Sequence, residues 1–332
     1  MAAPILIVDD EPINLARLRD ILDDRYDLVF ARNGKEALAA VAKHRPALIL
    51  LDVRMPEMDG YEVCRQLKGS EQTEDIPIIF VTSLEGEWHE EAGFTAGCVD
   101  YITKPVSPPV VHARVRTHLS LVRAKRLEGA YRDAIFMLGE AGHYNDTDTG
   151  LHIWRMAAYS RTLAEAAGWP KERIDLIELA APMHDTGKIG IPDAILKKPA
   201  ALDAAERKIM NEHPHIGYDI LSKSQAPVFR LAAEVALNHH EKWDGSGYPA
   251  GLAGSAIPES ARIVTIADVF DALIVKRPYK PAWPLEQVLG YLQDGSGRHF
   301  DPELLATFLK ILPQILSIKA EWDAREAAPA AS

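Results

Sequence analysis

Features typical of secreted and membrane proteins are scarce in this sequence. It has only two cysteines, Cys64 and Cys98, and no CxxC pair, so it offers no disulfide framework. No apolar run approaches the roughly 20 residues that a helix needs to cross a bilayer. The first residues, MAAPILIVDDEP, lack the basic segment of a secretion signal. These absences predict a protein of the reducing cytoplasm with no membrane contact.

Basic residues are also in the minority. The 37 lysines and arginines face 48 aspartates and glutamates, which gives a formal net charge of −11. Because affinity for nucleic acids rests largely on cations that neutralise phosphates, we expect no DNA-binding surface. A small phosphorylated substrate held by metal ions is compatible with this charge. The length of 332 residues exceeds that of one ordinary core and indicates two domains.

The first 120 residues alternate short apolar runs with amphipathic segments. This alternation predicts an α/β doubly wound domain, a five-stranded parallel sheet with helices on both faces. The expected strands are residues 5–8, 28–31, 47–51, 78–81 and 100–103. The expected helices are residues 14–24, 34–44, 60–68 and 86–97.

Charged and hydroxyl side chains follow these strands. Asp9 and Asp10 end the first strand and Asp52 ends the third, while Thr82 and Lys104 follow the fourth and fifth. The carboxyl ends of parallel strands meet at one edge, where ligands bind. Three converging carboxylates would repel one another unless a hard cation such as Mg²⁺ lay among them. Taken singly, each acid would be an ordinary loop or helix-capping residue.

Four motifs in order, ILIVDDEP, LLDVRMPEMDG, FVTS and DYITKP, resemble the receiver domain of response regulators. We assign residues 1–122 to this domain. The resemblance implies that Asp52 accepts a phosphoryl group from a cognate histidine kinase and that Asp9 and Asp10 help to hold Mg²⁺. By the same resemblance, the switch and phosphoryl contacts are Thr82, Tyr101 and Lys104.

A long helical pattern follows the receiver motifs over residues 107–138. Its apolar positions include Val111, Val115 and Leu119, spaced four residues apart. We assign residues 123–137 to a helical connector. It is either the end of the last receiver helix or a dimerising helix pair that carries the phosphorylation signal, so a homodimer stays an open alternative.

The second half is helical in pattern and predicts an all-α bundle. The expected helices are residues 152–168, 172–185, 204–214, 228–243, 261–274 and 284–295. They carry ligand-type residues at their ends or on inner faces, where unpaired imidazoles and carboxylates are costly to bury. The set is His152, His184, Asp185, His213, His239, His240 and Asp268.

Mixed nitrogen and oxygen ligands suit Fe, Mn, Ni or Zn rather than Mg²⁺ alone. Metal ions bridged by a carboxylate can activate water and clamp a phosphate ester. Each histidine alone would more often be an ordinary hydrogen-bonded residue at a helix end. Asp271, close to Asp268 on the same expected helix, competes with it for the ligand role.

The loop HHEKWDGSGYPAGLAG follows the histidine pair. Its glycines alone would favour an ordinary surface turn. However, Tyr248 offers a ring for base stacking, and Arg277 and Lys280 of KRPYK are suitable phosphate partners.

The motifs HDTGKIGIPD, HHEKWDGSGYP, IADVFDALIVKRPYK and HFDP resemble the HD-GYP subgroup of HD-type phosphohydrolases. The resemblance implies hydrolysis of cyclic di-GMP to pGpG or GMP at a centre of two or three metal ions. It implies that the seven residues above are the metal ligands, with Asp185 bridging and Lys188 assisting the water or the leaving oxygen. The substrate-binding residues that it implies are Gly247, Tyr248, Pro249, Arg277 and Lys280.

The number of metal ions depends on one position. Members of this subgroup with three metals carry Glu four residues before the first ligand histidine, whereas this chain has Asp148 there. Its side chain is one methylene shorter, although the spacing keeps it on the helical face of His152. We therefore expect two ions and leave a third, and the preference between cyclic di-GMP and pGpG, open.

The sequence thus predicts a response regulator whose phosphorylation at Asp52 controls a phosphodiesterase in residues 138–332. Two alternatives are a catalytically weak adaptor module and an HD hydrolase for pGpG or another nucleotide. Beyond the kinase and a cyclic dinucleotide, candidate partners are diguanylate-cyclase-type or other signalling proteins. Residues 324–332, AREAAPAAS, have little to bury and predict a disordered tail.

Overall fold

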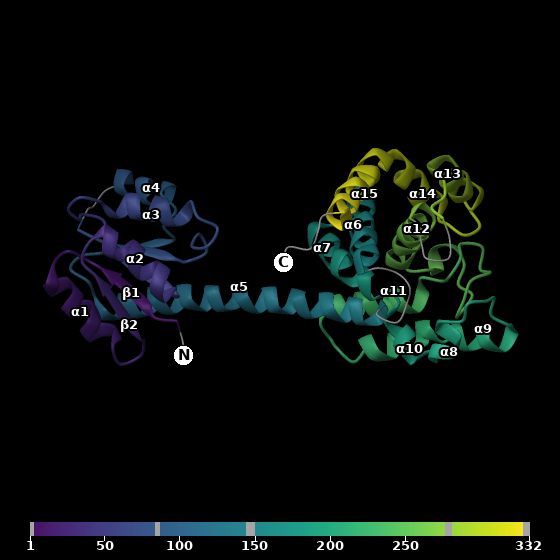
Figure 1. Ribbon diagram of the computed structural model, residues 1–332, viewed down its shortest axis with the longest axis horizontal. Helices are drawn as coiled ribbons and strands as arrows, with labels where there is room; N and C mark the ends of the chain where they lie inside the picture. The colour runs from purple at the N-terminus through teal and green to yellow at the C-terminus, as the bar shows by residue number, and fades with distance from the viewer. Residues whose placement is uncertain (1–2, 84–86, 144–149, 276–280, 328–332) are drawn as a thin grey trace. The chain divides into compact units, whose positions relative to one another are not determined.

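The computed structural model describes residues 3–83, 87–143, 150–275 and 281–327 (Figure 1). The chain divides into two compact units, Met1–Ala130 and Tyr131–Ser332. The division falls within helix α5 (Pro108–His143), inside the predicted connector. None of the described helices is long and apolar enough to cross a membrane.

The first unit is a five-stranded parallel sheet with the order β2-β1-β3-β4-β5, so the predicted fold class is confirmed here. Its strands are β1 (Ile5–Val8), β2 (Leu28–Ala31), β3 (Leu48–Asp52), β4 (Ile78–Thr82) and β5 (Asp100–Thr103). Its helices are α1 (Pro12–Leu22), α2 (Gly34–His44), α3 (Gly60–Lys68), α4 (Glu87–Thr95) and the first turns of α5.

Alternate residues of each strand enter different cores. Ile49 and Leu51 face the core that includes residues of α2 and α3, whereas Leu48 and Leu50 face the core of α1 and the first turns of α5. All four are fully buried. Because both sheet faces are covered, the strands are continuous apolar runs, which explains why the sequence identified them.

The second unit is helical, as predicted, and its described residues include no strand. Its α-helices are α6 (Gly150–Ala166), α7 (Lys171–Ala180), α8 (Asp193–Leu196), α9 (Ala204–Met210), α10 (His213–Leu221), α11 (Pro227–Asn238), α12 (Glu259–Ile274), α13 (Leu285–Asp294), α14 (Pro302–Lys310) and α15 (Leu312–Ala327). Its 3₁₀ turns are η1 (Ala181–Met183), η2 (Thr186–Gly190) and η3 (Gly254–Ala256).

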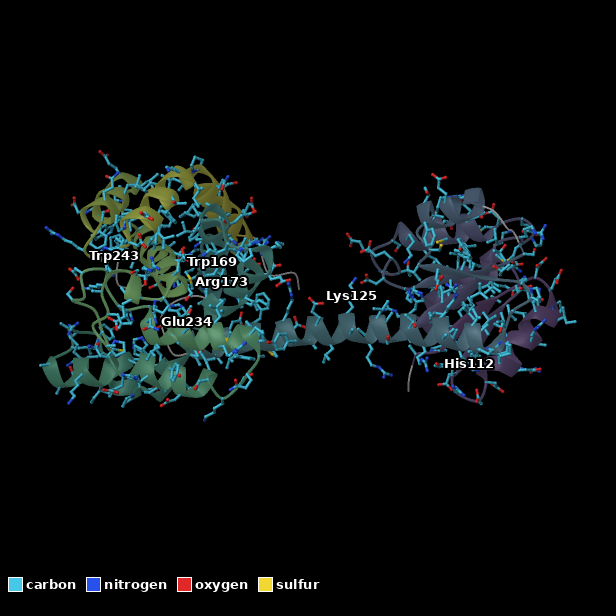
Figure 2. All side chains as sticks on the ribbon, turned by 180° about the vertical axis from the view of Figure 1, so that it is seen from behind. His112, Lys125, Trp169, Arg173, Glu234 and Trp243 are labelled. Atoms are coloured by element: carbon cyan, nitrogen blue, oxygen red, sulfur yellow. The ribbon has the colours of Figure 1, made fainter. Side chains whose placement is uncertain are left out.

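Helix α12 lies at the centre of the larger core of this unit, because most of its residues are buried. Phe270 on α12 contacts Tyr159 of α6 and Phe308 of α14 edge to face, with ring centroids 5.6 and 5.1 Å apart. At the turn between α6 and α7, the Arg173 guanidinium lies 3.8 Å from the centroid of the Trp169 ring (Figure 2). The two contacts of Phe270 link α6, α12 and α14, whereas the Arg173–Trp169 contact links α7 to the turn that precedes it.

Several predicted helix ends were wrong. The helix expected over 172–185 ends at Ala180, because Pro182 has no N–H for the next hydrogen bond and the chain continues as η1. His213 was expected to close a helix but instead begins α10, with Pro214 in its first turn. Helix α11 ends at Asn238, so the histidine pair follows it rather than lying within it.

The C-terminal end also differs from the expectation. Helix α15 continues to Ala327, so the first four residues of the predicted disordered tail are helical. The remainder, residues 328–332, lies outside the described residues. Helices α10, α14 and α15 were not foreseen from the sequence.

The packing of α3 against β3 predicts a cost for any side chain at Gly60. A Cβ there would lie 2.3 Å from the Asp52 carbonyl oxygen. We expect Gly60→Ala to destabilise the receiver unit by roughly 1–3 kcal/mol, because backbone must shift to make room. Urea unfolding followed by probes in each unit would measure this.

Gly129→Ala is the matched control, because nothing lies within 4 Å of a Cβ at this helical position. Alanine should stabilise the helix there by about 0.5–1 kcal/mol. An equally stable Gly60→Ala protein would contradict the packing argument.

Candidate metal centre

Five segments of the second unit bring the predicted ligands together. His152 lies on α6 and Asp268 on α12, while His184 and Asp185 lie between η1 and η2. His213 begins α10, and His239 and His240 follow α11. Residues as far apart as 152 and 268 in the sequence therefore meet at one place in the fold.

The Asp185 carboxylate lies between two groups of histidines. Its Oδ1 is 3.3 Å from His213 Nε2 and 3.5 Å from His239 Nε2. Its Oδ2 is 3.2 Å from His184 Nε2. The two oxygens of one carboxylate thus face different imidazoles.

One of the two groups is compact enough to surround a cation. One ligand atom from each of Asp185, His213, His239 and His240 lies within 4.8 Å of the others. On the other side, Asp268 Oδ1 is 3.6 Å from His152 Nε2 and 4.0 Å from His184 Nε2. The structure therefore brings together all seven residues that the sequence singled out.

Backbone carbonyls determine how three of these imidazoles are oriented. The Nδ1 atoms of His184, His213 and His239 lie 2.9, 2.8 and 2.9 Å from the carbonyl oxygens of Ala181, Met210 and Ala236. A carbonyl oxygen can only accept a hydrogen bond, so each Nδ1 carries the proton. Each Nε2 is therefore the ring atom directed toward Asp185, the orientation that a metal ligand requires.

A buried carboxylate performs the same task for His152. Asp271 contacts His152 Nδ1 and accepts hydrogen bonds from Arg155, whose Nη2 lies 2.8 Å away. Burial would raise the pKa of Asp271, but His152 and Arg155 lower it to about 2. Asp271 therefore orients His152 by contacting its Nδ1 atom. Asp268, one helical turn earlier, faces the histidines. Spacing alone left these two roles undecided, whereas the family resemblance implied that Asp268 is the ligand.

The electrostatics favour a cation at this centre. Burial lowers the pKa of His239, and burial with the neighbouring histidines lowers that of His240 far below its usual value, so both imidazoles stay neutral. Burial would also lower the pKa of His184, but Asp185 and Asp268 raise it to about 9. Lys188 Nζ lies 2.7 Å from Asp185 Oδ2. Neutral imidazoles and carboxylates that converge form a donor set that fits a transition-metal ion.

The glycine-rich loop packs against the histidine pair. A Cβ on Gly247 would lie 2.3 Å from the Lys242 backbone nitrogen, so only glycine fits this close approach. The Tyr248 ring stacks on His240, with centroids 4.7 Å apart and planes inclined by 22°. Pro249 follows it in the wall of an adjoining cavity. The loop therefore lies at the edge of the centre.

Sequence reasoning missed Glu241, which holds this loop. Its side chain is buried and accepts hydrogen bonds from the backbone N–H groups of Ala250, Gly251 and Leu252, at 2.7, 3.1 and 3.0 Å. The sequence feature that could have identified Glu241 was its position directly after the histidine pair. Three hydrogen bonds from backbone amides to one carboxylate hold this loop in place.

Three predicted residues lie outside the described residues, namely Asp148, Arg277 and Lys280. The expectations that concern a third metal ion and the KRPYK phosphate contacts therefore remain predictions.

The receiver unit has a separate acidic cluster at the carboxyl ends of β1 and β3. Oxygens of Asp9, Asp10 and Asp52 lie within 4.8 Å of one another. Lys104 Nζ is 2.7 Å from Asp9 Oδ2 and 3.1 Å from Asp52 Oδ2. Burial raises the pKa of Asp52, and Lys104 counteracts part of this rise. Thr82 is buried at the end of the neighbouring strand β4.

Tyr101, on β5, is partly buried. Its ring meets Phe94 edge to face with centroids 6.2 Å apart, and the Arg114 guanidinium lies 5.8 Å from its centroid. All six predicted receiver residues thus lie on β1, β3, β4 and β5 or directly after them.

Two known domain families match this chain. Residues 5–116 match the response regulator receiver domain, and residues 130–304 match the HD domain. The chain therefore belongs to the response regulators that carry an HD domain, whose members are metal-dependent hydrolases.

Its relatives include the "cyclic di-GMP phosphodiesterase response regulator RpfG" of Xanthomonas campestris pv. campestris, which is 39% identical over 98% of this chain and 92% of the relative. The "cyclic di-GMP phosphodiesterase" of Thermotoga maritima is 34% identical over 95% of this chain and 92% of the relative. The "3'3'-cGAMP-specific phosphodiesterase 2" of Vibrio cholerae is 44% identical over 57% of this chain and 36% of the relative.

The contact between Asp271 and His152 predicts a role in metal retention. We expect Asp271→Asn to lower metal affinity by about 10–100-fold, because an uncharged amide holds the His152 imidazole less firmly than the carboxylate does. Elemental analysis after dialysis against graded chelator would measure the loss. Asp294→Asn, at an exposed position on α13, is the control. Full metal retention by a folded Asp271→Asn protein would refute this role.

Proposed function

We propose that this protein is a metal-dependent cyclic di-GMP phosphodiesterase controlled by phosphorylation of Asp52. The observation that carries the proposal is the Asp185 carboxylate, whose two oxygens face two separate groups of histidines. A carboxylate in that position can bridge two metal ions. The names of the relatives that cover nearly the whole chain support cyclic di-GMP as the substrate.

The two groups define the ligands of each ion. One ion would be held by His152, His184, Asp185 and Asp268, and the other by Asp185, His213, His239 and His240. Their nitrogen-rich character favours Fe, Mn, Ni or Zn, and we propose two ions. When bound, such ions supply Lewis-acid chemistry that stabilises charge on a phosphodiester.

Side chains around the centre would complete the reaction. The Lys188 ammonium, beside Asp185, is placed to neutralise charge on the leaving oxygen as the phosphodiester is cleaved in line. Tyr248 offers a partly buried aromatic ring for the substrate, and Gly247 and Pro249 set its position. Arg277 and Lys280 are proposed as further phosphate contacts. The expected product is pGpG, with or without further cleavage to GMP.

The acidic cluster of the receiver unit provides the regulatory step. We propose that Asp9, Asp10 and Asp52 bind Mg²⁺ and that Asp52 accepts a phosphoryl group from a histidine kinase. Lys104, already between Asp9 and Asp52, would then contact the phosphoryl oxygens. Thr82 and Tyr101 would respond to the phosphoryl group, and helix α5 would transmit the resulting change to the helical unit.

Turnover assays with Mn²⁺- or Fe²⁺-loaded protein test the activity. The wild-type chain should cleave cyclic di-GMP, and Asp185→Asn should lose more than about 100-fold in kcat, because both ions depend on this carboxylate. Asp193→Asn, at an exposed position on α8, should retain activity. Parallel assays with pGpG and 3'3'-cGAMP would identify the preferred nucleotide. A metal-loaded wild-type protein that leaves all three intact would refute the proposal.

Phosphorylation at Asp52 should change this turnover. With Mg²⁺ and the phosphoryl mimic beryllofluoride, we expect kcat/KM of the wild type to change by about fivefold or more, the size of a typical allosteric coupling. Asp52→Asn should show no response, although its basal turnover should match that of the untreated wild type. An unchanged wild-type rate, or an equal response from Asp52→Asn, would contradict control through this residue.

A further inference from the structure

A cavity of about 440 Å³ adjoins the metal centre and has no assigned role. Its walls come from α9, the start of α10 and the glycine-rich loop. The residues that matter here are Arg207, Lys208, Asn211, Glu212 and Tyr248. It is large enough for a nucleotide base and the phosphate beside it.

Tyr248 separates this cavity from the metal centre. Its ring stacks on His240, whose Nε2 lies 3.1 Å from His213 Nε2. Tyr248 also lines the cavity together with Arg207. The tyrosine is therefore close both to the metal ligands and to Arg207. A substrate that extends past this ring reaches the cavity.

The cavity contains two cations, Arg207 and Lys208, and one acid, Glu212. Within the part of the chain that the structure describes, neither Arg207 nor Lys208 forms an ion pair. The nearby Lys197 and Lys198, by contrast, are paired with Asp193 and Glu206, at 3.0 and 2.5 Å. In a chain with a net charge of −11, two exposed cations without a partner beside a cavity favour binding of an anion.

A cyclic dinucleotide has a group that fits this description. It contains two phosphodiesters, and only one of them can lie at the metal ions during a cleavage event. We propose that the cavity binds the other half of the substrate, with Arg207 on the phosphodiester that does not react and Asn211 and Glu212 on the edge of its base. This inference rests on the proposed function and names the substrate contacts of the same site.

The acid in the cavity favours guanine over adenine. The Watson–Crick edge of guanine presents two donors, N1–H and the N2 amino group, which a carboxylate can accept. Adenine presents an acceptor at N1, which would face the Glu212 carboxylate without a hydrogen bond. A site built to bond a substrate donor discriminates strongly against an analogue that lacks it.

Steady-state kinetics of the full-length, metal-loaded protein with two substrates test the subsite. Cyclic di-GMP occupies both the centre and the cavity, whereas bis(4-nitrophenyl) phosphate has neither a second phosphodiester nor a base. For Arg207→Ala we expect KM for cyclic di-GMP to rise about tenfold or more, with kcat within about twofold of the wild type, because a charge-assisted hydrogen bond is lost. Hydrolysis of bis(4-nitrophenyl) phosphate and the metal content should not change.

Two further variants sharpen the result. Arg207→Lys keeps the charge and should recover part of the lost affinity. Arg230→Ala removes an exposed arginine on α11 that does not line the cavity and should leave KM unchanged.

A third variant tests the base contact. Glu212→Gln should lower the preference for cyclic di-GMP over cyclic di-AMP, measured as the ratio of their kcat/KM values, because cyclic di-AMP has no guanine to place in the cavity. An unchanged ratio would overturn the guanine contact.

The outcomes separate the two proposals. If the wild type cleaves cyclic di-GMP but Arg207→Ala has an unchanged KM, or loses bis(4-nitrophenyl) phosphate hydrolysis in parallel, the subsite is overturned and the proposed function stands. If the metal-loaded wild type cleaves bis(4-nitrophenyl) phosphate but no cyclic dinucleotide, the proposed function fails and the subsite fails with it.

Discussion

The helical unit depends on one repeated hydrogen bond. His184, His213 and His239 each donate from Nδ1 to the backbone carbonyl three residues earlier, which leaves Nε2 directed at Asp185. Carbonyls and amides at helix ends lack intrahelical partners, so a side chain at such a position finds one close by. The orientation of the ligands is therefore decided where a 3₁₀ turn ends, where α10 begins and where α11 ends. The smaller core that contains Met183, Leu221 and Ala236 packs these three segments together.

The sequence predicted the receiver unit more fully than the helical one, for a physical reason. Strands covered on both faces must be apolar throughout, and the helices between them end where their apolar periodicity ends. In the helical unit, the periodicity located the helices but not their ends. Pro182 breaks the helix that the pattern extends to Asp185, and the pattern runs on through His213 although a new helix begins there. Turns between packed helices are set by tertiary contacts, which periodicity does not encode.

The same distinction applies to the candidate site. Motifs identified the seven residues that converge in space, including Asp268, but they assigned no role to the second carboxylate nearby, Asp271. Asp268 and Asp271 are three residues apart on α12, and only the position of Arg155 on α6 shows that Asp271 lies behind His152. Glu241 was missed for a similar reason, because its partners are backbone amides of a loop whose path no residue pattern specifies.

Both acidic clusters contain a lysine of their own, Lys104 in the receiver unit and Lys188 in the helical unit, each 2.7 Å from an aspartate oxygen. An internal ammonium balances carboxylates that would otherwise repel one another when no divalent ion is bound. In each unit the lysine therefore supplies part of the positive charge that the carboxylates require, so a bound cation would share that role rather than supply it alone.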